Sequence, residues 1–351
     1  MQGPARRLLT RLSERLSAMS HANYDVLGIG NAIVDVIAVA EEDFLIAEGL
    51  AKGSMTLIDE ERAEALYGRM GPAVEASGGS AANTLAGLGS LGGRAAFLGK
   101  VKADTLGGVF AHDITAIGVH FPTAPATKGA ATARCFVLVT PDGERTMSTY
   151  LGAAQALGPD DVDAATVEAA HVTYLEGYLW DPPAAKEAFR KAADIAHGAG
   201  RQVALSLSDS FCVERYRAEF LELIRTGVVD ILFANDSELK ALYETGDIEA
   251  ALQAVAADAK LAAVTLGADG CVVLQGGERV SVPAAPVDGA IVDKTGAGDL
   301  FAAGFLFGHV RGLGLRRSGE LGSLAAAEVI SHVGARPLVS LKTLAESRGL
   351  I

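Results

Sequence analysis

From residue 170 onward, short apolar runs rich in β-branched residues alternate with longer segments that have the spacing of amphipathic helices. Alternation of strand and helix is typical of a parallel sheet that is covered by helices on both faces. The predicted strands are 172–175, 203–207, 229–233 and 262–266, followed by the paired strands 271–275 and 279–282. The predicted helices are 182–197, 210–224, 237–243 and 248–257. The pattern therefore predicts an α/β fold with a mainly parallel central sheet.

The first half of the chain has a second group of β-rich segments. A strand is predicted at 25–30, a β-rich run at 36–39 and a further short strand at 54–58, and residues 59–70 have the pattern of a surface helix. Residues 132–150 predict a hairpin whose turn is Pro141-Asp142-Gly143. We expect these segments, near 33–40, 53–58 and 130–150, to form a small sheet that acts as a lid within one domain of residues 23–351.

Residues 293–299 (DKTGAGD) contain the clearest candidate for chemistry. Ile291 and Val292 before them predict the end of a strand, and the apolar run 300–307 after them predicts a buried helix. Glycines at such a junction let a phosphate approach the backbone, and the first N–H groups of a helix have no partner within the helix. Asp299 can be the cap of this helix, or it can take a proton from a hydroxyl that attacks a bound phosphate. The sequence alone leaves both interpretations open.

Polar residues follow several of the predicted strands, at the edge of the sheet where ligands of α/β proteins bind. They are Glu176, Asp209, Asn235 with Glu238, and Gly267. Asn235 and Glu238 have the spacing of a helix-capping box, and Glu238 can cap the helix while it also orients a water molecule bound to magnesium.

Two charged residues outside the βα region also have two interpretations each. Asp35 lies within an apolar segment, where its carboxylate either pairs with the backbone or accepts hydrogen bonds from ligand hydroxyls. Arg145 follows the turn of the predicted hairpin, so it either reaches a phosphate when the lid closes or remains a solvated charge.

Composition excludes several classes of partner. The net charge of −13 argues against non-specific binding of nucleic acid and against an anionic membrane surface. No segment reaches the roughly 18 uninterrupted apolar residues of a membrane span, so we expect a soluble protein. The three cysteines are widely spaced and form no metal-binding pair, which is typical of a reducing cytoplasm. Residues 1–22 are basic and amphipathic, and we interpret them as a disordered or upstream-start extension in preference to a membrane-docking or targeting segment.

Two motifs together resemble the signature regions of the ribokinase-like, or PfkB, carbohydrate and nucleoside kinases. They are residues 78–83 (GGSAAN) and 293–299 (DKTGAGD), and the similarity extends in order from residue 25 to about residue 340. Within this family, the segments 30–35, 142–145 and 331–337 most resemble the adenosine kinase branch, in particular its bacterial members. The resemblance implies a three-layer α/β/α sandwich with a β-sheet lid, and phosphorylation of the 5′-hydroxyl of adenosine by ATP with Mg²⁺.

The resemblance also implies a role for individual residues. Asp299 would be the general base, and the anion hole for the transferred phosphate would consist of the N–H groups of Gly296, Ala297 and Gly298. Arg145 would close over the phosphates. The ribose hydroxyls would be held by Asn31, Asp35, Gly79 and Asn83. The nucleobase pocket would contain Ile33, Met55, Cys135 and Tyr178.

At the ATP end, Asn235 and Glu238 would serve the phosphates and magnesium. The adenine of ATP would be flanked by Gly267, Ser323 and the predicted helix 325–332, which ends at His332. One residue departs from the family pattern, because Lys294 stands where the family usually has Thr or Ser beside a loop that often holds a monovalent cation. Its ammonium group can replace K⁺, repel it or point to solvent, which puts K⁺ activation in doubt.

Three functions remain open from the sequence. The first is an adenosine kinase, active as a monomer or homodimer on a small nucleoside and ATP. The second is a kinase of the same family that acts on ribose, fructose, inosine or guanosine. The third is a non-catalytic nucleotide-binding regulator, against which the presence of Asp299, the glycines and Arg145 together argues, since a binding protein needs no base.

Overall fold

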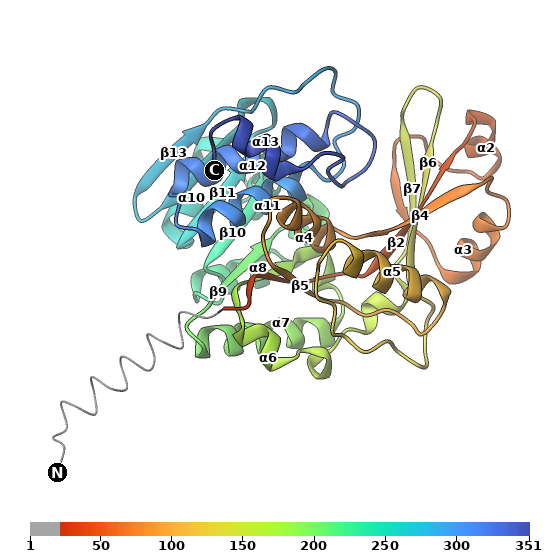
Figure 1. The fold of residues 1–351 in the computed structure, drawn as a ribbon, viewed down its shortest axis with the longest axis horizontal. Coiled ribbons are helices and arrows are strands. Elements are labelled where there is room, and N and C mark those ends of the chain that lie inside the picture. The colour runs from red at the N-terminus through yellow and green to blue at the C-terminus, as the bar shows by residue number, and fades with distance from the viewer. Residues whose placement is uncertain (1–21) are drawn as a thin grey trace, which may run out of the picture.

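The structure is a computed structural model and describes residues 22–351, so the basic extension predicted at 1–22 lies almost wholly outside the described residues. Its main sheet has eight strands in the order β13-β12-β11-β10-β9-β8-β1-β5 (Figure 1). Their bounds are β1 Tyr24–Ile29, β5 Ala95–Leu98, β8 Ala170–Glu176, β9 Gln202–Ser206, β10 Ile231–Asn235, β11 Leu261–Thr265, β12 Cys271–Gln275 and β13 Glu278–Val282. All neighbouring strands from β11 to β5 run parallel, whereas β12 and β13 pair antiparallel at one edge.

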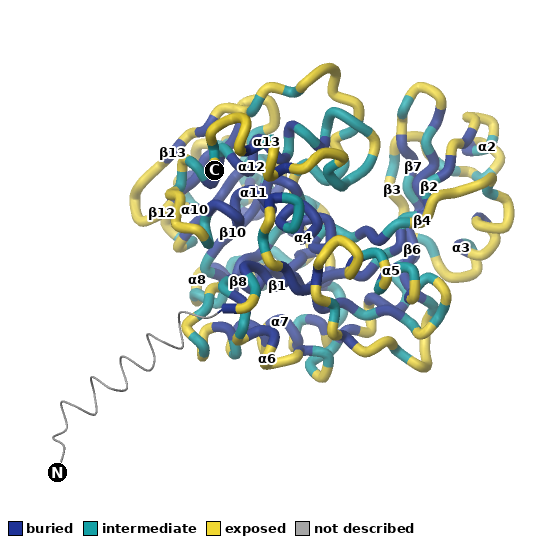
Figure 2. Tube along the Cα trace, viewed as in Figure 1, coloured by how far each residue is buried: buried dark blue, intermediate teal, exposed yellow. Residues whose placement is uncertain are grey.

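Helices cover both faces of the main sheet because its central strands are apolar on both sides. In β10, for example, Ile231 and Phe233 pack into one core and Leu232 and Ala234 into the other. The first face is covered by α4 Ser80–Ser90, α11 Ala297–Val310, α12 Leu315–Val329 and α13 Leu341–Ser347. The second face is covered by α6 Ala164–Glu168, α7 Pro183–Gly198, α8 Ser210–Arg225, α9 Asp236–Leu242 and α10 Ile248–Asp258. The expected three-layer α/β/α sandwich is confirmed, with its buried layers visible in Figure 2.

A second, small sheet stands apart from the main one in the order β3-β7-β6-β2-β4 (Figure 1). Its strands are β2 Ile33–Val39, β3 Met55–Leu57, β4 Ala73–Gly78, β6 Ala133–Val139 and β7 Arg145–Tyr150. The neighbouring helices are α2 Glu42–Ala47, α3 Glu60–Tyr67 and α5 Thr105–Ala116. Within residues 22–351 the 3₁₀ turns are η1 Gly152–Ala156, η2 Pro159–Asp161, η3 Gly177–Trp180 and η4 Gly267–Asp269.

The small sheet has one buried face and one face that is left free. Along β2, Val34 and Val36 are buried in the core that α3 and α5 share, whereas Ile33 and Asp35 alternate with them on the opposite side. This alternation follows from the two-residue period of a strand. The face that carries Asp35 therefore remains open toward the main domain.

The predicted elements of the second half agree with the structure to within a few residues, but one expectation near the glycine motif is wrong. Ile291 and Val292 do not end a strand; both are exposed, and the Val292 N–H donates to the carbonyl oxygen of Ile330 at 2.8 Å. β-branched residues favour strands only where a neighbouring strand and a surface to pack on are present, and neither exists here. The predicted helix 325–332 also ends earlier, since α12 stops at Val329.

Several elements had no sequence prediction. They are α2, β4, β5 and α5 within residues 42–116, together with α6 and α13 later in the chain. Among the described residues, no helix has the length and apolar character that crossing a membrane requires.

Candidate active site

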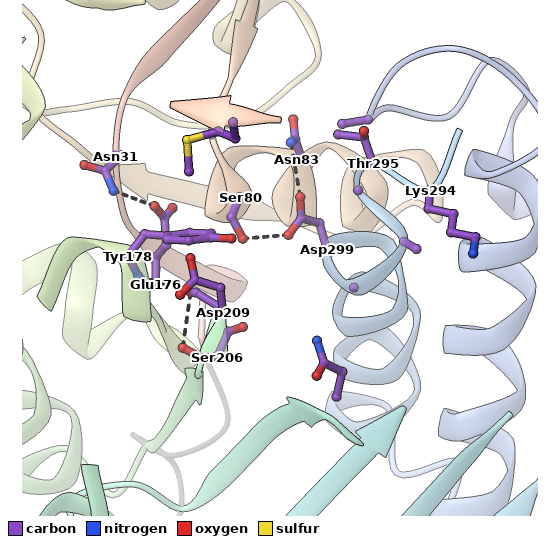
Figure 3. Close-up of a pocket in the computed structure, with 18 of the residues that line it drawn as sticks. Asn31, Ser80, Asn83, Glu176, Tyr178, Ser206, Asp209, Lys294, Thr295 and Asp299 are labelled. Atoms are coloured by element: carbon purple, nitrogen blue, oxygen red, sulfur yellow. Dashed lines mark hydrogen bonds between the residues drawn. The ribbon is translucent and has the colours of Figure 1, made fainter. Parts of the chain in front are cut away.

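A cavity of about 830 Å³ lies between the open face of the small sheet and the carboxyl ends of the main-sheet strands. Its size suits a small-molecule ligand. The main domain contributes residues that directly follow β8, β9, β10 and β11, together with the start of α11, as expected for a ligand site in an α/β fold. Figure 3 shows how side chains from these separate elements point into one space.

The glycine motif forms the N-terminus of α11 at one wall of the cavity. Gly296 has φ of 79°, and a Cβ atom there would lie 2.8 Å from Cα of Ala335, so the turn requires glycine. The N–H of Ala297 donates to the Lys294 carbonyl oxygen at 3.2 Å and closes the turn. Within residues 22–351, the N–H groups of Gly296 and Gly298 have no backbone acceptor. Two of the three N–H groups predicted for the anion hole are thus available, and that of Ala297 is used locally.

Asp299 lies in the first turn of α11 and contacts α4 across the cavity wall (Figure 3). Its Oδ1 accepts a hydrogen bond from Ser80 Oγ at 2.6 Å, and its Oδ2 accepts one from Asn83 Nδ2 at 3.2 Å. Burial raises the pKa of this carboxyl group to about 6, against the lowering effect of these two donors. Asp299 is therefore ionised at neutral pH, yet its pKa is high enough for it to accept a proton from a ligand.

Asp293 joins the glycine motif to the small sheet. Its Oδ2 lies 2.8 Å from Nη1 of Arg145 and accepts the Gly334 N–H at 3.1 Å. Its Oδ1 accepts both the N–H and the hydroxyl group of Thr295, at 2.9 and 2.7 Å. The ion pair is almost inaccessible to water, since 8% of the Arg145 side chain and 7% of the Asp293 side chain are exposed. The alternative of a solvated hairpin charge at Arg145 is therefore wrong.

Part of the Arg145 guanidinium group has no partner among the described residues. Its Nε and Nη2 atoms are buried and make no hydrogen bond, although the side chain lines the cavity. Buried donors in proteins are nearly always satisfied, so these two unpartnered atoms make Arg145 a candidate contact for a ligand with acceptor oxygens. A phosphate group has the required charge and geometry.

The wall formed by β2 and the start of α4 contains the residues predicted for the ribose: Asn31, Asp35, Gly79 and Asn83. Burial raises the pKa of Asp35 to about 6, while the charges of Arg336 and then Arg145 lower it. Asn31 does not face the cavity freely, because its Nδ2 donates to Oε1 of the buried Glu176 at 2.7 Å. Asn83 contacts Asp299, as described above, which the sequence did not predict.

The residues predicted for the nucleobase also line the cavity: Ile33, Met55, Cys135 and Tyr178. The structure adds further apolar side chains from the same face of the small sheet, which the sequence analysis missed: Ile37, Leu57, Val137 and Met147. Ile37 and Met147 alternate along their strands with buried residues, so for these two the two-residue period was the available signal. This wall is apolar and contains several sulfur atoms.

Asn235, Glu238 and Gly267 line the other end of the cavity. The predicted capping box is present, because Asn235 Oδ1 accepts the Glu238 N–H and Glu238 Oε2 accepts the Asn235 N–H, both at 2.9 Å. Glu238 Oε1 also accepts from Asn235 Nδ2 at 2.6 Å. Burial raises the pKa of Glu238 to about 7, and the charges of Asp209, Asp236 and Asp299 raise it further.

Ser323 and His332 do not line this cavity. Ser323 is buried in α12 beside the Cys271 thiol of β12. His332 lies beyond the end of α12, where its Nε2 is 3.2 Å from Oε1 of Glu328. Ser323 and His332 therefore lie apart from the other residues that were predicted for the ligand site.

Lys294 is exposed at the rim of the cavity, and its side chain extends away from Asp299 (Figure 3). Of the three arrangements considered for this residue, the structure shows the one in which the ammonium group points to solvent. The sequence analysis did not single out Ser80 or Arg336. Ser80 contacts Asp299 and Arg336 contacts Asn83, and in both cases the two residues are far apart in the chain.

A model of the pfkB carbohydrate kinase family matches residues 49–342. The chain belongs to this family of kinases. It is a phosphotransferase that acts on a hydroxyl group, and the family implies ATP as the substrate that donates the phosphoryl group. The non-catalytic alternative is therefore not favoured.

Individual relatives give a finer comparison. The structure of an adenosine kinase from Sinorhizobium meliloti is 60% identical, has a TM-score of 0.86 and covers 93% of this chain and 100% of that chain. The structure of a probable sugar kinase from Rhizobium etli CFN 42 is 56% identical, with a TM-score of 0.88, and covers 94% of this chain and 100% of that chain. Adenosine kinase 2 of Arabidopsis thaliana is 26% identical over 343 residues, which are 90% of this chain and 96% of that protein.

The hydrogen bonds and the ion pair of Asp293 lead to a prediction about monovalent cations. Its carboxylate already accepts from Thr295, Gly334 and Arg145, so it has no free oxygen with which to bind K⁺ strongly. We expect the turnover number to be the same in KCl as in tetramethylammonium chloride at equal ionic strength, measured by a coupled kinase assay. A many-fold increase in KCl would contradict this.

Proposed function

We propose that this kinase transfers the γ-phosphoryl group of ATP to the 5′-hydroxyl group of adenosine and so produces AMP and ADP. The main support is the 60% identity with the adenosine kinase of Sinorhizobium meliloti over the whole length of that chain. The cavity supports the same proposal through its wall chemistry, with carboxylates and amides on one side and apolar side chains on the other.

On the nucleoside side, Asp35 would accept hydrogen bonds from the two ribose hydroxyls, because a carboxylate has acceptor sites for both. Asn31 and the backbone at Gly79 lie beside it. The purine would then lie against the apolar face of the small sheet, where Met55 and Cys135 offer polarisable sulfur atoms to a flat ring. Small sugars have no apolar plane to fill this wall, and their binding would leave it exposed to water.

On the phosphate side, the N–H groups of Gly296 and Gly298 and the positive end of the α11 dipole would hold the transferred group. Arg145 would donate from its unpartnered Nε and Nη2 atoms. Since Arg145 lies on β7, the small sheet would act as a lid whose closure excludes water from the reacting phosphate.

Asp299 would take the proton of the 5′-hydroxyl as its oxygen attacks the γ-phosphorus. The bond between that phosphorus and the bridging oxygen of ADP breaks, and the proton stays on the Asp299 carboxyl group until product release. Ser80 and Asn83 hold this carboxylate in place through the hydrogen bonds already described. Positioning the base and the anion hole in one dry cavity is the main source of catalysis in phosphoryl transfer.

Mg²⁺ fits the acidic end of the cavity as a water-bridged ion. Among the described residues no group of three or more carboxylate, His or Cys side chains is arranged to hold a metal ion. Glu238 is buried among other carboxylates, and a nearby cation would relieve their mutual repulsion. Magnesium bound to ATP keeps most of its waters and needs few protein ligands, and it neutralises charge on the phosphates.

The proposed substrate can be tested with a panel of acceptors. We expect adenosine to have the highest kcat/KM with Mg-ATP when it is compared with inosine, guanosine, ribose and fructose in a coupled assay for ADP. A clear preference for ribose or fructose would instead support a sugar kinase, which is what the Rhizobium etli relative is named.

The role of Asp299 can be tested by Asp299→Asn, which keeps the shape of the side chain but removes the base. We expect kcat to fall by about two to four orders of magnitude while adenosine still binds, measured by steady-state kinetics and calorimetry. In the wild type, kcat should decrease as the pH falls through about 6, because protonation of Asp299 removes the acceptor.

Asp247→Asn is the matched control, since Asp247 caps α10 away from the cavity and asparagine caps a helix equally well. Its kinetics should equal those of the wild type. Turnover by Asp299→Asn within a few-fold of the wild type would refute the base assignment.

A further inference from the structure

Arg336 lies in the loop after α12 and does not line the cavity, yet it contacts Asn83, which does. Its Nε donates to Oδ1 of Asn83 at 3.4 Å, and its Nη1 is 3.1 Å from Oδ2 of Asp113 in α5. Most of the side chain is enclosed, with 21% of it exposed. The guanidinium group therefore links the C-terminal loop to α4 of the main domain and to α5 beside the small sheet.

The contact with Asn83 fixes the orientation of an amide group. An asparagine side chain has an acceptor oxygen and a donor nitrogen of nearly the same shape, so either can face a given neighbour. Because Oδ1 of Asn83 accepts from Arg336, its Nδ2 faces Asp299 and donates to Oδ2 at 3.2 Å. In the flipped orientation, two oxygen atoms would face each other and repel the Asp299 carboxylate.

The other end of Arg336 is itself held in place. Asp113 Oδ2 accepts the N–H of Ser77 at 2.7 Å and also the Ser77 hydroxyl group. Ser77 lies in β4 and pairs with Val34, which is the neighbour of Asp35 in β2. Arg336 thus connects the strand that carries Asp35 with the asparagine that contacts Asp299.

We propose that Arg336 is a positioning residue for phosphoryl transfer: it holds the Asn83 amide so that the nitrogen, and not the oxygen, faces Asp299. This proposal rests on the proposed role of Asp299 as the base. Arg336 itself touches neither substrate nor phosphate. Its charge lowers the pKa of Asp35, and its effect on the base passes through Asn83. Displacement of the base lowers the rate of phosphoryl transfer far more than the loss of one weak hydrogen bond would by itself.

A double-mutant cycle tests this proposal, because residues that act through one contact have non-additive effects. Arg336→Met should lower kcat by up to about a hundredfold and leave the KM for ATP unchanged. In the Asn83→Ala background, the same change at Arg336 should lower kcat no further, because no amide remains to be oriented. Equal fold-changes in both backgrounds, or a wild-type kcat for the folded Arg336→Met protein, would overturn the proposal.

Two further variants keep the result interpretable. Arg311→Met is the matched control: Arg311 pairs with Asp25 at 3.1 Å and stacks on Phe307, outside the cavity, so its kcat should equal that of the wild type. If Arg336→Met does not fold, the cycle uses Arg336→Gln, whose shorter side chain cannot reach Asn83 and Asp113 together, with the same criteria. If the wild type does not phosphorylate adenosine, the proposed substrate fails, and the cycle is measured with whichever acceptor is phosphorylated.

Discussion

The buried ion pair between Arg145 and Asp293 joins the small sheet to the glycine motif before α11, at the point where the phosphate is expected. Arg145 lines the cavity that lies between the small sheet and the carboxyl ends of the main strands. Burying two charges is costly, and removing one partner of such a pair typically costs about 3–5 kcal/mol, because the other charge remains without compensation. The pair therefore holds Arg145 in one position. The other nitrogen atoms of the Arg145 guanidinium group can bind a ligand from there.

The same burial gives the carboxyl groups of the cavity their unusual character. The pKa of Asp299 and that of Asp35 are raised to about 6, and those of Glu238 and Glu176 to about 7, in each case mainly by burial. Such a group of buried acids is stable only beside cations or hydrogen-bond donors. Arg145 and Arg336 supply the cations, while Ser80 and Asn83 supply donors to the proposed base.

The sequence predicted those parts of the structure that depend on local pattern. The βα alternation after residue 170 located the main sheet, and the glycines before α11 located the N-terminus at which Asp299 lies. Gly296 was identifiable as part of the glycine-rich motif, and the structure shows that it has a positive φ. The capping box of Asn235 and Glu238 was likewise visible from the spacing of the two residues.

Features that depend on contacts between distant segments were not predictable in this way. Ile291 and Val292 have strand-forming side chains, but no neighbouring strand lies beside them. The contacts of Ser80 and Arg336 join residues more than 200 positions apart, and no periodic pattern records them. Ser323 and His332 were assigned from the family resemblance, and the structure does not place them in the cavity.

The central claim, that Asp299 and the start of α11 bring base and phosphate together, is tested most directly by a crystal structure with adenosine and a non-hydrolysable ATP analogue. We expect the 5′-oxygen within about 2.6–3.2 Å of a carboxylate oxygen of Asp299. The γ-phosphate should accept hydrogen bonds from the N–H groups of Gly296 and Gly298 and from Arg145. A 5′-oxygen beyond hydrogen-bond reach of Asp299, or a γ-phosphate bound away from this helix terminus, would contradict the account.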